Sequence, residues 1–346
     1  MQWSTPEVKQ LNKELIRREM QQSGECTKAK IARKTSLSIV TCNTLLNEML
    51  EENEIIPADE EEIRSGRPGR PASQYVYNVD YLHVMGVYID ICESDIKLEY
   101  VVADAFGQER LHEEKREESM DYQYIEDVIA EVIEKDPLIR GISFGVPGVV
   151  DGGIVESCDV ESLTGVDIKG NIKRRFGIEA EVRNDMDFIS YGIYSGASVE
   201  GDLATIFFPT DENGCVGAGF IIGGKVINGS SQYSGELSYI AEAFGISRKH
   251  QEEMRRDRGE FCDLVFKMVM IVIGTVDPEK IVIMGNDINS EELMRVWSKC
   301  NEVISKKHIP DISIDSNIER NYAKGLVSIA LNKLQFPISM DLQEEK

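Results

Sequence analysis

The chain has 346 residues, of which 42% are hydrophobic, so it is long enough for two or three domains with their own cores. Its net charge of −23 excludes nucleic-acid binding through overall charge. Residues 1–78 nevertheless carry 11 Lys and Arg against 12 Asp and Glu, whereas the rest of the chain carries 27 against 49. Any contact with phosphates must therefore come from a locally basic face near the N-terminus.

The seven cysteines are scattered, with no C-x-C or C-x-x-C spacing. This pattern predicts a reducing cytoplasm, and neither a zinc site nor a disulfide framework. The N-terminus lacks the apolar core of a signal peptide. The most apolar run, residues 261–276, contains Asp263 and Lys267 and is too short to span a bilayer. We therefore expect a soluble, cytoplasmic protein with no membrane contact.

Three helical patterns open the chain. Residues 6–22 form the first, and two shorter helices then flank a turn at residues 35–37. Thr27 and Ser38 are suited to cap the two shorter helices, because a hydroxyl can accept a hydrogen bond from a free amide of the first turn. The second of them is expected to direct an apolar set of side chains inward: Val40, Leu45, Leu46, Met49 and Leu50.

Two short helices across a tight turn predict a helix-turn-helix, whose second helix, residues 38–51, fits the major groove of DNA. An ordinary helical hairpin is the alternative, and the segment downstream argues against it. Residues 65–78 contain two Gly-Arg-Pro units that hold the backbone extended, followed by a strand at residues 75–77. This pattern is typical of a wing, whose arginines reach phosphates or a narrow minor groove. The candidate DNA contacts are Thr27, Lys28, Lys30, Ser36, Ser38, Thr41, Asn43, Thr44, Asn47, Arg67 and Arg70.

From residue 82 the pattern changes to strands alternating with helices. The first set is expected at residues 83–91, 96–103, 108–115, 122–134, 139–146, 168–176 and 180–183, of which 122–134 and 168–176 are helices. A near repeat follows, with helices at 188–195, 259–275 and 321–334 and strands at 203–209, 216–222 and 280–284. The repeat predicts a duplicated, sugar-kinase-like α/β lobe. Asn184 and Asp185 would lie at the carboxyl end of a strand, where ligands of open α/β sheets usually bind.

The ordered motifs are more specific than any one of them. Behind the winged helix-turn-helix come G-V-P-G-V-V-D-G from Gly145, N-D-x-D from Asn184, V-G-A-G-F-I-I-G-G-K-V from Val216 and G-E-L from Gly235. Over residues 9–334 this set resembles the ROK family of repressors, open reading frames and sugar kinases. The resemblance implies an actin-like ATPase fold of two lobes around a cleft, usually in a dimer or tetramer.

The chain departs from the family's kinases at both phosphate loops. Their D-x-G-G-T, whose glycines let the backbone approach the phosphates of ATP, reads D-I-C-E-S at residues 90–94. Their G-T-G-x-G is replaced by N-G-C-V-G at residues 213–217. Glycines are lost, and Glu93 would place a carboxylate beside a polyphosphate. We therefore expect no nucleotide cofactor and no kinase activity.

The resemblance also assigns candidate sugar contacts. Asp185 stands at the general-base position of the family's kinases, although capping of the following helix is an equal alternative for Asn184-Asp185. Glu236 matches the Glu of G-E-x-G-H, which grips sugar hydroxyls, but Tyr239 replaces the His, and the family's zinc-binding C-x-C-G-x-x-G-C loop is missing. We therefore expect no metal. The candidate effector-binding residues are Gly148, Asn184, Asp185, Glu236 and Tyr239.

Together these features predict an α/β protein with an N-terminal winged helix-turn-helix at residues 1–80, followed by a two-lobed actin-like ATPase (sugar-kinase-like) domain. The first lobe would span residues 81–186, with the C-terminal helix 319–336 packing back on it, and the second lobe residues 187–318. We expect a DNA-binding transcriptional regulator, a repressor, without kinase activity. Its partners would be a double-stranded DNA operator, a sugar or sugar-phosphate effector in the cleft, and its own copies in a homodimer or homotetramer. The alternatives are an active sugar kinase and a regulator that has lost its small-molecule effector.

Overall fold

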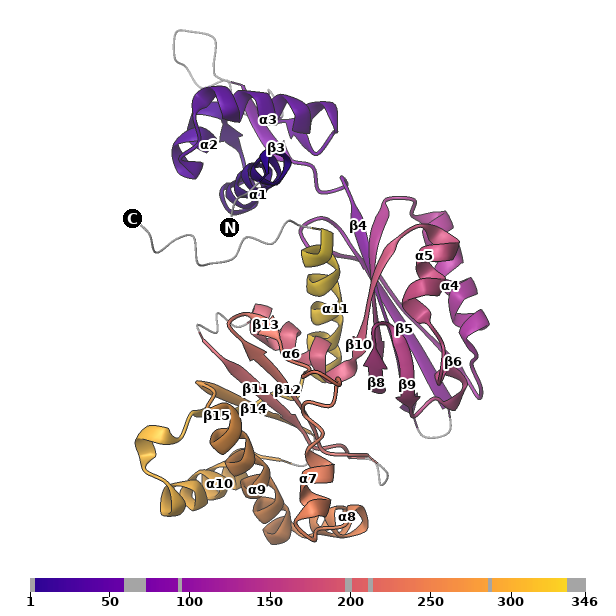
Figure 1. Ribbon diagram of the computed structural model, residues 1–346, viewed down its shortest axis with the longest axis vertical. Coiled ribbons are helices and arrows are strands. Elements are labelled where there is room, and N and C mark those ends of the chain that lie inside the picture. Colours follow the sequence, from indigo (N-terminus) through magenta and orange to yellow (C-terminus); the bar gives the residue numbers. More distant parts are fainter. Residues whose placement is uncertain are drawn as a thin grey trace.

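The computed structural model describes residues 4–58, 73–92, 95–196, 201–210, 214–285 and 288–334. Figure 1 shows a helical head above a two-lobed body, with helices α6 (Asp185–Gly196) and α11 (Ile318–Leu334) between the lobes. Arg67 and Arg70 of the expected wing, and Glu93 of the altered phosphate loop, lie outside the described residues. None of the helices in the described ranges is long and apolar enough to cross a membrane.

The head combines three helices with a small sheet. Helices α1 (Thr5–Ser23), α2 (Lys28–Thr35) and α3 (Ile39–Glu51) confirm the three expected helices. The antiparallel strands lie side by side in the order β1 (Cys26–Thr27), β3 (Gln74–Tyr77) and β2 (Ile55–Pro57). Both predicted caps form: Thr27 Oγ1 accepts a hydrogen bond from the Lys30 amide at 3.2 Å, and Ser38 Oγ accepts one from the Thr41 amide at 3.0 Å. The head is thus a helix-turn-helix with a three-stranded antiparallel sheet.

One expected core residue of α3 was wrong. Val40 points to solvent and is 76% exposed, whereas Cys42 is fully buried. A helix turns once every 3.6 residues, so Cys42 shares a face with Leu45, Leu46 and Met49, and Val40 does not. The prediction counted Val40 as core because it is apolar, although it is out of phase with the buried face.

The two lobes repeat one sheet topology. In the first sheet the order is β10 (Glu179–Asn184), β7 (Ile139–Val146), β4 (His83–Cys92), β5 (Asp95–Ala103) and β6 (Glu109–Glu117). In the second it is β15 (Asp311–Ile314), β14 (Lys280–Met284), β11 (Leu203–Phe207), β12 (Gly217–Ile222) and β13 (Lys225–Val226). Each sheet contains three antiparallel strands followed by two parallel ones, which confirms the predicted duplication.

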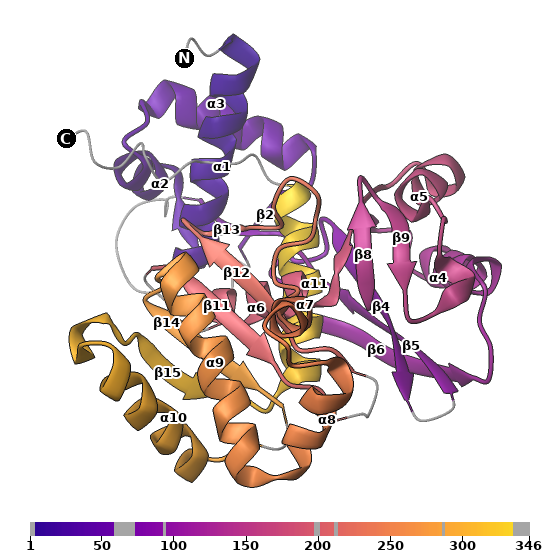
Figure 2. The ribbon, with the colours of Figure 1, turned by 60° about the horizontal axis from the view of Figure 1, so that its bottom comes forward.

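Helices cover both sheets. Helices α4 (Tyr122–Lys135) and α5 (Ile168–Phe176) pack on the first lobe, and α9 (Arg258–Val276) on the second, as predicted. In Figure 2, α9 and α10 (Ser290–Val303) lie over the strands of the second sheet. The sequence patterns missed α10, β15, and the helices α7 (Leu237–Ala243) and α8 (Arg248–Arg256). They also missed a hairpin formed by β8 (Gly148–Asp151) and β9 (Ile154–Cys158).

Helices α6 and α11 join the lobes. At their crossing, a Cβ on Gly192 would meet the Asn321 carbonyl oxygen, and a Cβ on Gly325 would meet that of Phe188. The two glycines therefore allow the helix backbones to approach closely. A single apolar cluster includes residues of α6, of α11, of β4 in the first sheet and of β11 in the second. The carboxyl ends of β7 and β10 lie next to this crossing.

Candidate nucleic-acid interface and inter-lobe site

The predicted DNA-facing residues of α3 line one accessible face. Thr44 and Asn47 are exposed, and Thr41 and Asn43 are partly buried. The hydroxyls of Ser38 and Thr41 hydrogen-bond to each other at 2.9 Å, and Thr44 Oγ1 donates to the Val40 carbonyl at 3.1 Å. These bonds are local to the helix, so the short polar groups of this face can contact a partner without a change in the fold.

Two apolar residues join this face, and the sequence patterns did not place them there. Ile39 and Val40 are 64% and 76% exposed at the first turn of α3. Apolar side chains at the start of a recognition helix suit contact with the methyl group of thymine. For Val40 the signal available in the sequence was that it is out of phase with the buried positions Cys42, Leu45 and Leu46. Ile39 is in phase with Cys42 and Leu46, but it is the first residue of the helix and lies beyond the end of the core.

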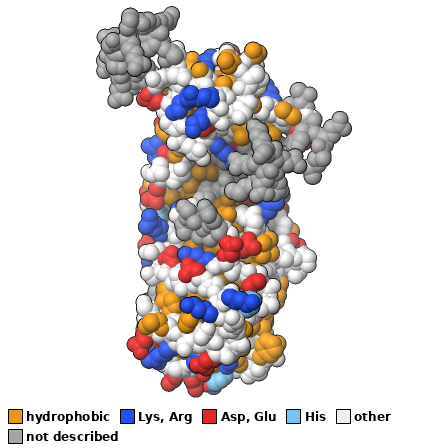
Figure 3. All heavy atoms as spheres, turned by 90° about the vertical axis from the view of Figure 1, so that its left-hand side faces the viewer, with side chains coloured by type: hydrophobic (Ala, Val, Ile, Leu, Met, Phe, Trp, Pro, Cys, Tyr) orange, Lys and Arg blue, Asp and Glu red, His pale blue; other side chains and the backbone are white. Residues whose placement is uncertain are grey.

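Helix α2 supplies basic residues beside α3. Lys28 Nζ donates to Asn47 Oδ1 at 2.8 Å and stands 5.5 Å from the centroid of the Tyr75 ring, so the structure brings α2, α3 and β3 together at this point. Lys30 Nζ contacts the Glu25 carbonyl at 3.4 Å. Figure 3 shows Lys and Arg side chains gathered on the head on this side of the molecule. Among the other candidates, Ser36 is exposed in the left-handed turn, and the hydroxyl of Thr27 is engaged in its cap.

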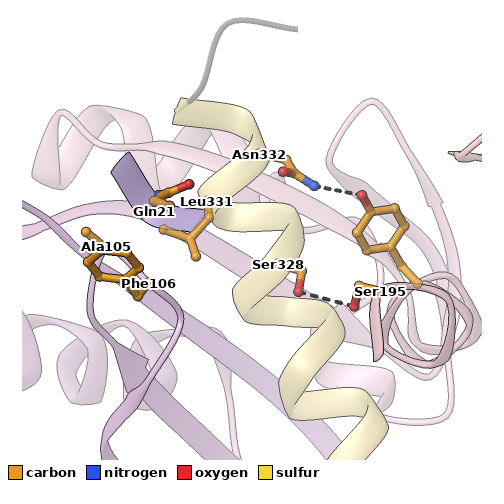
Figure 4. A pocket seen from close by; sticks show the side chains of 8 residues that line it. Gln21, Ala105, Phe106, Ser195, Ser328, Leu331 and Asn332 are labelled. Atoms are coloured by element: carbon orange, nitrogen blue, oxygen red, sulfur yellow. Dashed lines mark hydrogen bonds between the residues drawn. The ribbon is translucent and has the colours of Figure 1, made fainter. Parts of the chain in front are cut away.

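The head rests on the body through the turn between β5 and β6. Ala105 and Phe106 of this turn join the apolar core of the head, and the Phe106 ring lies 5.6 Å from that of Tyr77. The Ala105 amide donates to the Val79 carbonyl at 3.1 Å. Figure 4 shows a pocket of about 390 Å³ beside this contact, between Gln21 of α1, the turn, and the α6–α11 pair. The head therefore packs directly against the first lobe.

At the inter-lobe site, Asn184 acts as a structural residue. Its Oδ1 accepts a hydrogen bond from the Met186 amide at 2.8 Å, and its Nδ2 donates to the Gly148 carbonyl at 2.9 Å. The first bond is a helix cap, which bears out the capping alternative for this residue. Gly148 does not leave room for a ligand, because the backbone of Ser157 and Cys158 fills the space where its Cβ would lie. The expected role of Gly148 as a spacer in the cleft was therefore wrong.

Asp185 lies in an acidic environment. Burial raises its pKa to about 7, and the nearby carboxylates of Asp90, Asp159 and Asp187 add to the shift, although a hydrogen bond from the Met186 amide opposes it. Burial also raises the pKa of Asp187, to about 6, against the opposing effects of Arg183 and Asn228. Such shifts are typical of functional carboxylates.

Glu236 belongs to the same acidic site. Burial raises its pKa, Arg248 opposes the shift, and Asp159 adds to it. Asp159 thus lies within electrostatic reach of both Glu236 and Asp185, and neither it nor Arg248 had any local signal in the sequence. Tyr239 is exposed at the edge, with the Arg248 guanidinium 4.5 Å from its ring centroid and the Tyr233 ring 5.4 Å away. Within the described ranges, no group of three or more His, Cys, Asp or Glu residues is arranged to hold a metal ion.

Comparison with known proteins identifies the body. The model of the ROK family matches residues 89–244. The xylose repressors of Bacillus subtilis and Caldicellulosiruptor bescii are 22% and 23% identical to this chain over 252 and 248 residues. Each match covers 68% of this chain, and 62% and 60% of the respective repressor. The chain thus spans about three fifths of the length of these curated relatives.

Solved structures extend the likeness to the whole fold. The crystal structure of a ROK family transcriptional regulator, a homolog of the E. coli MLC protein, has a TM-score of 0.68 at 15% identity and covers 94% of this chain and 97% of its own. A ROK hexokinase from Thermus thermophilus has a TM-score of 0.56 at 14% identity and covers 73% of this chain and 99% of its own. The chain therefore carries a ROK family domain at residues 89–244, within a body that has the two-lobed sugar-kinase-like fold, behind a helix-turn-helix head.

Proposed function

We propose that this chain is a DNA-binding transcriptional repressor of the ROK type. The observation that carries the proposal is the capped α2–α3 pair, which presents short polar side chains, two exposed apolar residues and the lysines of α2 on one face. The xylose repressors and the regulator described above support it. In this proposal residues 1–80 form the DNA-binding head, and residues 81–186 and 187–318 form the two lobes, with helix 319–336 on the first.

The mechanism would couple the cleft to the head. Asp185, Glu236 and Tyr239 hold a sugar or sugar-phosphate effector between the lobes, and the lobes change their relative position when it binds. Because the β5–β6 turn completes the core of the head, a movement of the first lobe moves the head with it. In a homodimer or homotetramer, the spacing of two heads then fits or misfits a palindromic operator.

Selection of DNA from a random library by the full chain tests the proposal. We expect enrichment of a palindromic sequence, and Asn47→Ala should weaken its binding about tenfold, because a well-placed amide contact with a base contributes roughly 1–3 kcal/mol. Asn301→Ala, at an exposed position of α10 in the body, is the matched control and should bind as the wild type does. Failure to enrich any sequence, or equal binding by the Asn47 variant, would rule out this head as the DNA reader.

A ROK-type sugar kinase is the second candidate, and the pKa of Asp185 favours it. A carboxylate with a pKa of about 7 is suited to take a proton from a sugar hydroxyl. Against it stands the loss of phosphate-loop glycines at residues 90–94. Thermal unfolding in the presence of Mg-ATP separates the two candidates, because a ligand that binds only the folded state raises the midpoint. We expect no shift with Mg-ATP, and a clear shift would reopen the kinase.

A further inference from the structure

A second cavity lies between the lobes, beside the acidic site. It has a volume of about 340 Å³. The first lobe contributes the β8–β9 turn, Lys169 at the start of α5, and the end of β10, while the second lobe contributes β13 and the segment after it. None of the effector residues predicted from the sequence lines it, so the predicted effector contacts leave this cavity without a role.

Two cationic side chains face the cavity with unused donors. Arg183 donates from Nη2 to Glu181 Oε2 at 3.2 Å, whereas its Nη1 has no hydrogen-bond partner among the described residues and its side chain is 31% exposed. Lys169 is partly buried and makes no ion pair in the same ranges. Hydrogen bonds to charged groups are stronger than those between neutral groups, so these two side chains are suited to hold an anion.

The carboxylates at the cavity do not cancel these charges. Glu181 is engaged by Lys333 Nζ at 2.6 Å, and although its burial favours the neutral form, Lys333, Arg183 and Lys169 together lower its pKa. Asp187 accepts a hydrogen bond from Asn228, and with a pKa of about 6 it is mostly ionised at neutral pH. Lys169, Arg183 and Lys333 against Glu181 and Asp187 leave about one positive charge at the cavity of a chain whose net charge is −23.

On both walls of the cavity, the backbone adopts positive φ angles. Gly153 has a φ of 97°, and a Cβ there would collide with the stem of Lys169, so the glycine lets that side chain lie against the β8–β9 turn. On the opposite wall, Gln232 adopts a φ of 56°, which is unusual for a residue with a side chain. The Ser234 amide closes this segment by donating to the Asn228 carbonyl at 3.1 Å. Backbone held in such conformations is often found at binding sites.

We propose that this cavity binds the oxyanion group, a phosphate or a carboxylate, of a small polyhydroxyl ligand. Arg183 Nη1 and Lys169 Nζ donate to the oxyanion, and the segment around Asn228 contacts the rest of the ligand. Such a ligand touches both lobes and therefore stabilises one inter-lobe arrangement over others. Binding here does not depend on the DNA binding proposed above.

Isothermal titration calorimetry on the full chain tests the proposal. The probes are a hexose monophosphate, a hexuronic acid, inorganic phosphate and a neutral hexose, so that the arms separate phosphate from carboxylate recognition and both from sugar recognition. We expect at least one oxyanion-bearing sugar to bind, and Lys169→Met and Arg183→Gln each to weaken it about tenfold or more, as for hydrogen bonds to charged groups. Lys173→Met, an exposed lysine of the same helix paired with Glu179, should bind as the wild type does.

Hydrogen exchange locates the ligand independently of the variants. The bound probe should protect amides of residues 151–154 and 226–232, on both walls of the cavity. The proposal is overturned if no oxyanion binds at millimolar concentration, or if both pocket variants bind it as tightly as Lys173→Met does. Either result leaves operator binding by the head untouched, so the failure of one proposal is distinguishable from the failure of the other.

Discussion

In the head, Glu14 and Glu54 are almost completely buried, and both lie against the same guanidinium. Arg17 Nη2 donates to Glu54 Oε2 at 3.2 Å, Arg17 Nη1 donates to Glu14 Oε2 at 3.3 Å, and Tyr77 donates its hydroxyl to Glu54. At the inter-lobe site, by contrast, the side chains that raise the pKa of Asp185 are other carboxylates. Both regions bury acidic side chains, but only the buried acids of the head have a cation, Arg17, placed directly against them.

The difference separates structural acids from functional ones. A buried ion pair with its hydrogen bonds satisfied fixes the geometry of α1 against β2 and β3 and offers nothing to a ligand. Carboxylates gathered with few cations cost free energy in the empty site, and a ligand that hydrogen-bonds to them can recover that free energy. The comparison therefore gives the buried acids of the head a role in its rigidity and fits the ligand binding proposed for the cleft.

Removing the cation of the head should have the largest effect. Arg17→Met leaves Glu54 and Glu14 buried without their shared partner, and breaking a buried pair in this way costs about 3–5 kcal/mol. Hydrogen exchange of the α1 and α3 amides in the full chain should report the loss. Arg18→Met is the matched control, because the Arg18 side chain is 46% exposed and pairs with Glu14 alone among the described residues, so its effect should stay below about 1 kcal/mol. Equal protection in the two variants would contradict a structural role for the buried pair.

Removing an acid from the cleft should raise the stability of the folded chain, whereas removing Arg17 lowers it. The pKa of Asp185 is about 7 in the folded chain, whereas its ordinary value, which applies to the unfolded chain, is 3.8. Between these two pH values the folded state therefore holds a proton that the unfolded state has lost. Stability therefore falls as the pH rises from about 4 to about 7, by up to roughly 4 kcal/mol.

Asp185→Asn abolishes this dependence. The variant should be more stable than the wild type at pH 8 and nearly equal to it at pH 4, which urea unfolding at the two pH values measures. Glu156→Gln, at an exposed position of β9, should follow the wild type at both. A variant that loses stability at pH 8 would mean that the Asp185 carboxylate is paired in the folded state, and the contrast with the head would disappear.

The same contrast explains what the sequence could predict. The helices, caps and turn of the head depend on residues close together in the chain, so Thr27 and Ser38 could be placed correctly from local patterns. The acidic site depends on Asp159, which follows β9, and on Arg248, which opens α8, and neither element was predicted. Residues that meet only through the packing of two lobes leave no local periodicity in the sequence. For the same reason the sequence could not show that Lys169 and Arg183 line one cavity.

The smallest expected effect concerns a polar group that is structural although it lies on the proposed DNA face. Ser38 Oγ accepts the Thr41 amide at the start of α3, so Ser38→Ala should lower local stability by about 1 kcal/mol. Ser38→Asp restores the cap but places a carboxylate beside the proposed phosphate contacts. We expect hydrogen exchange at the first turn of α3 to rise in the Ala variant and to recover in the Asp variant, whereas operator binding falls most in the Asp variant. If binding instead followed cap strength in both variants, Ser38 would act only through the fold of α3, and this end of the helix would not lie against DNA.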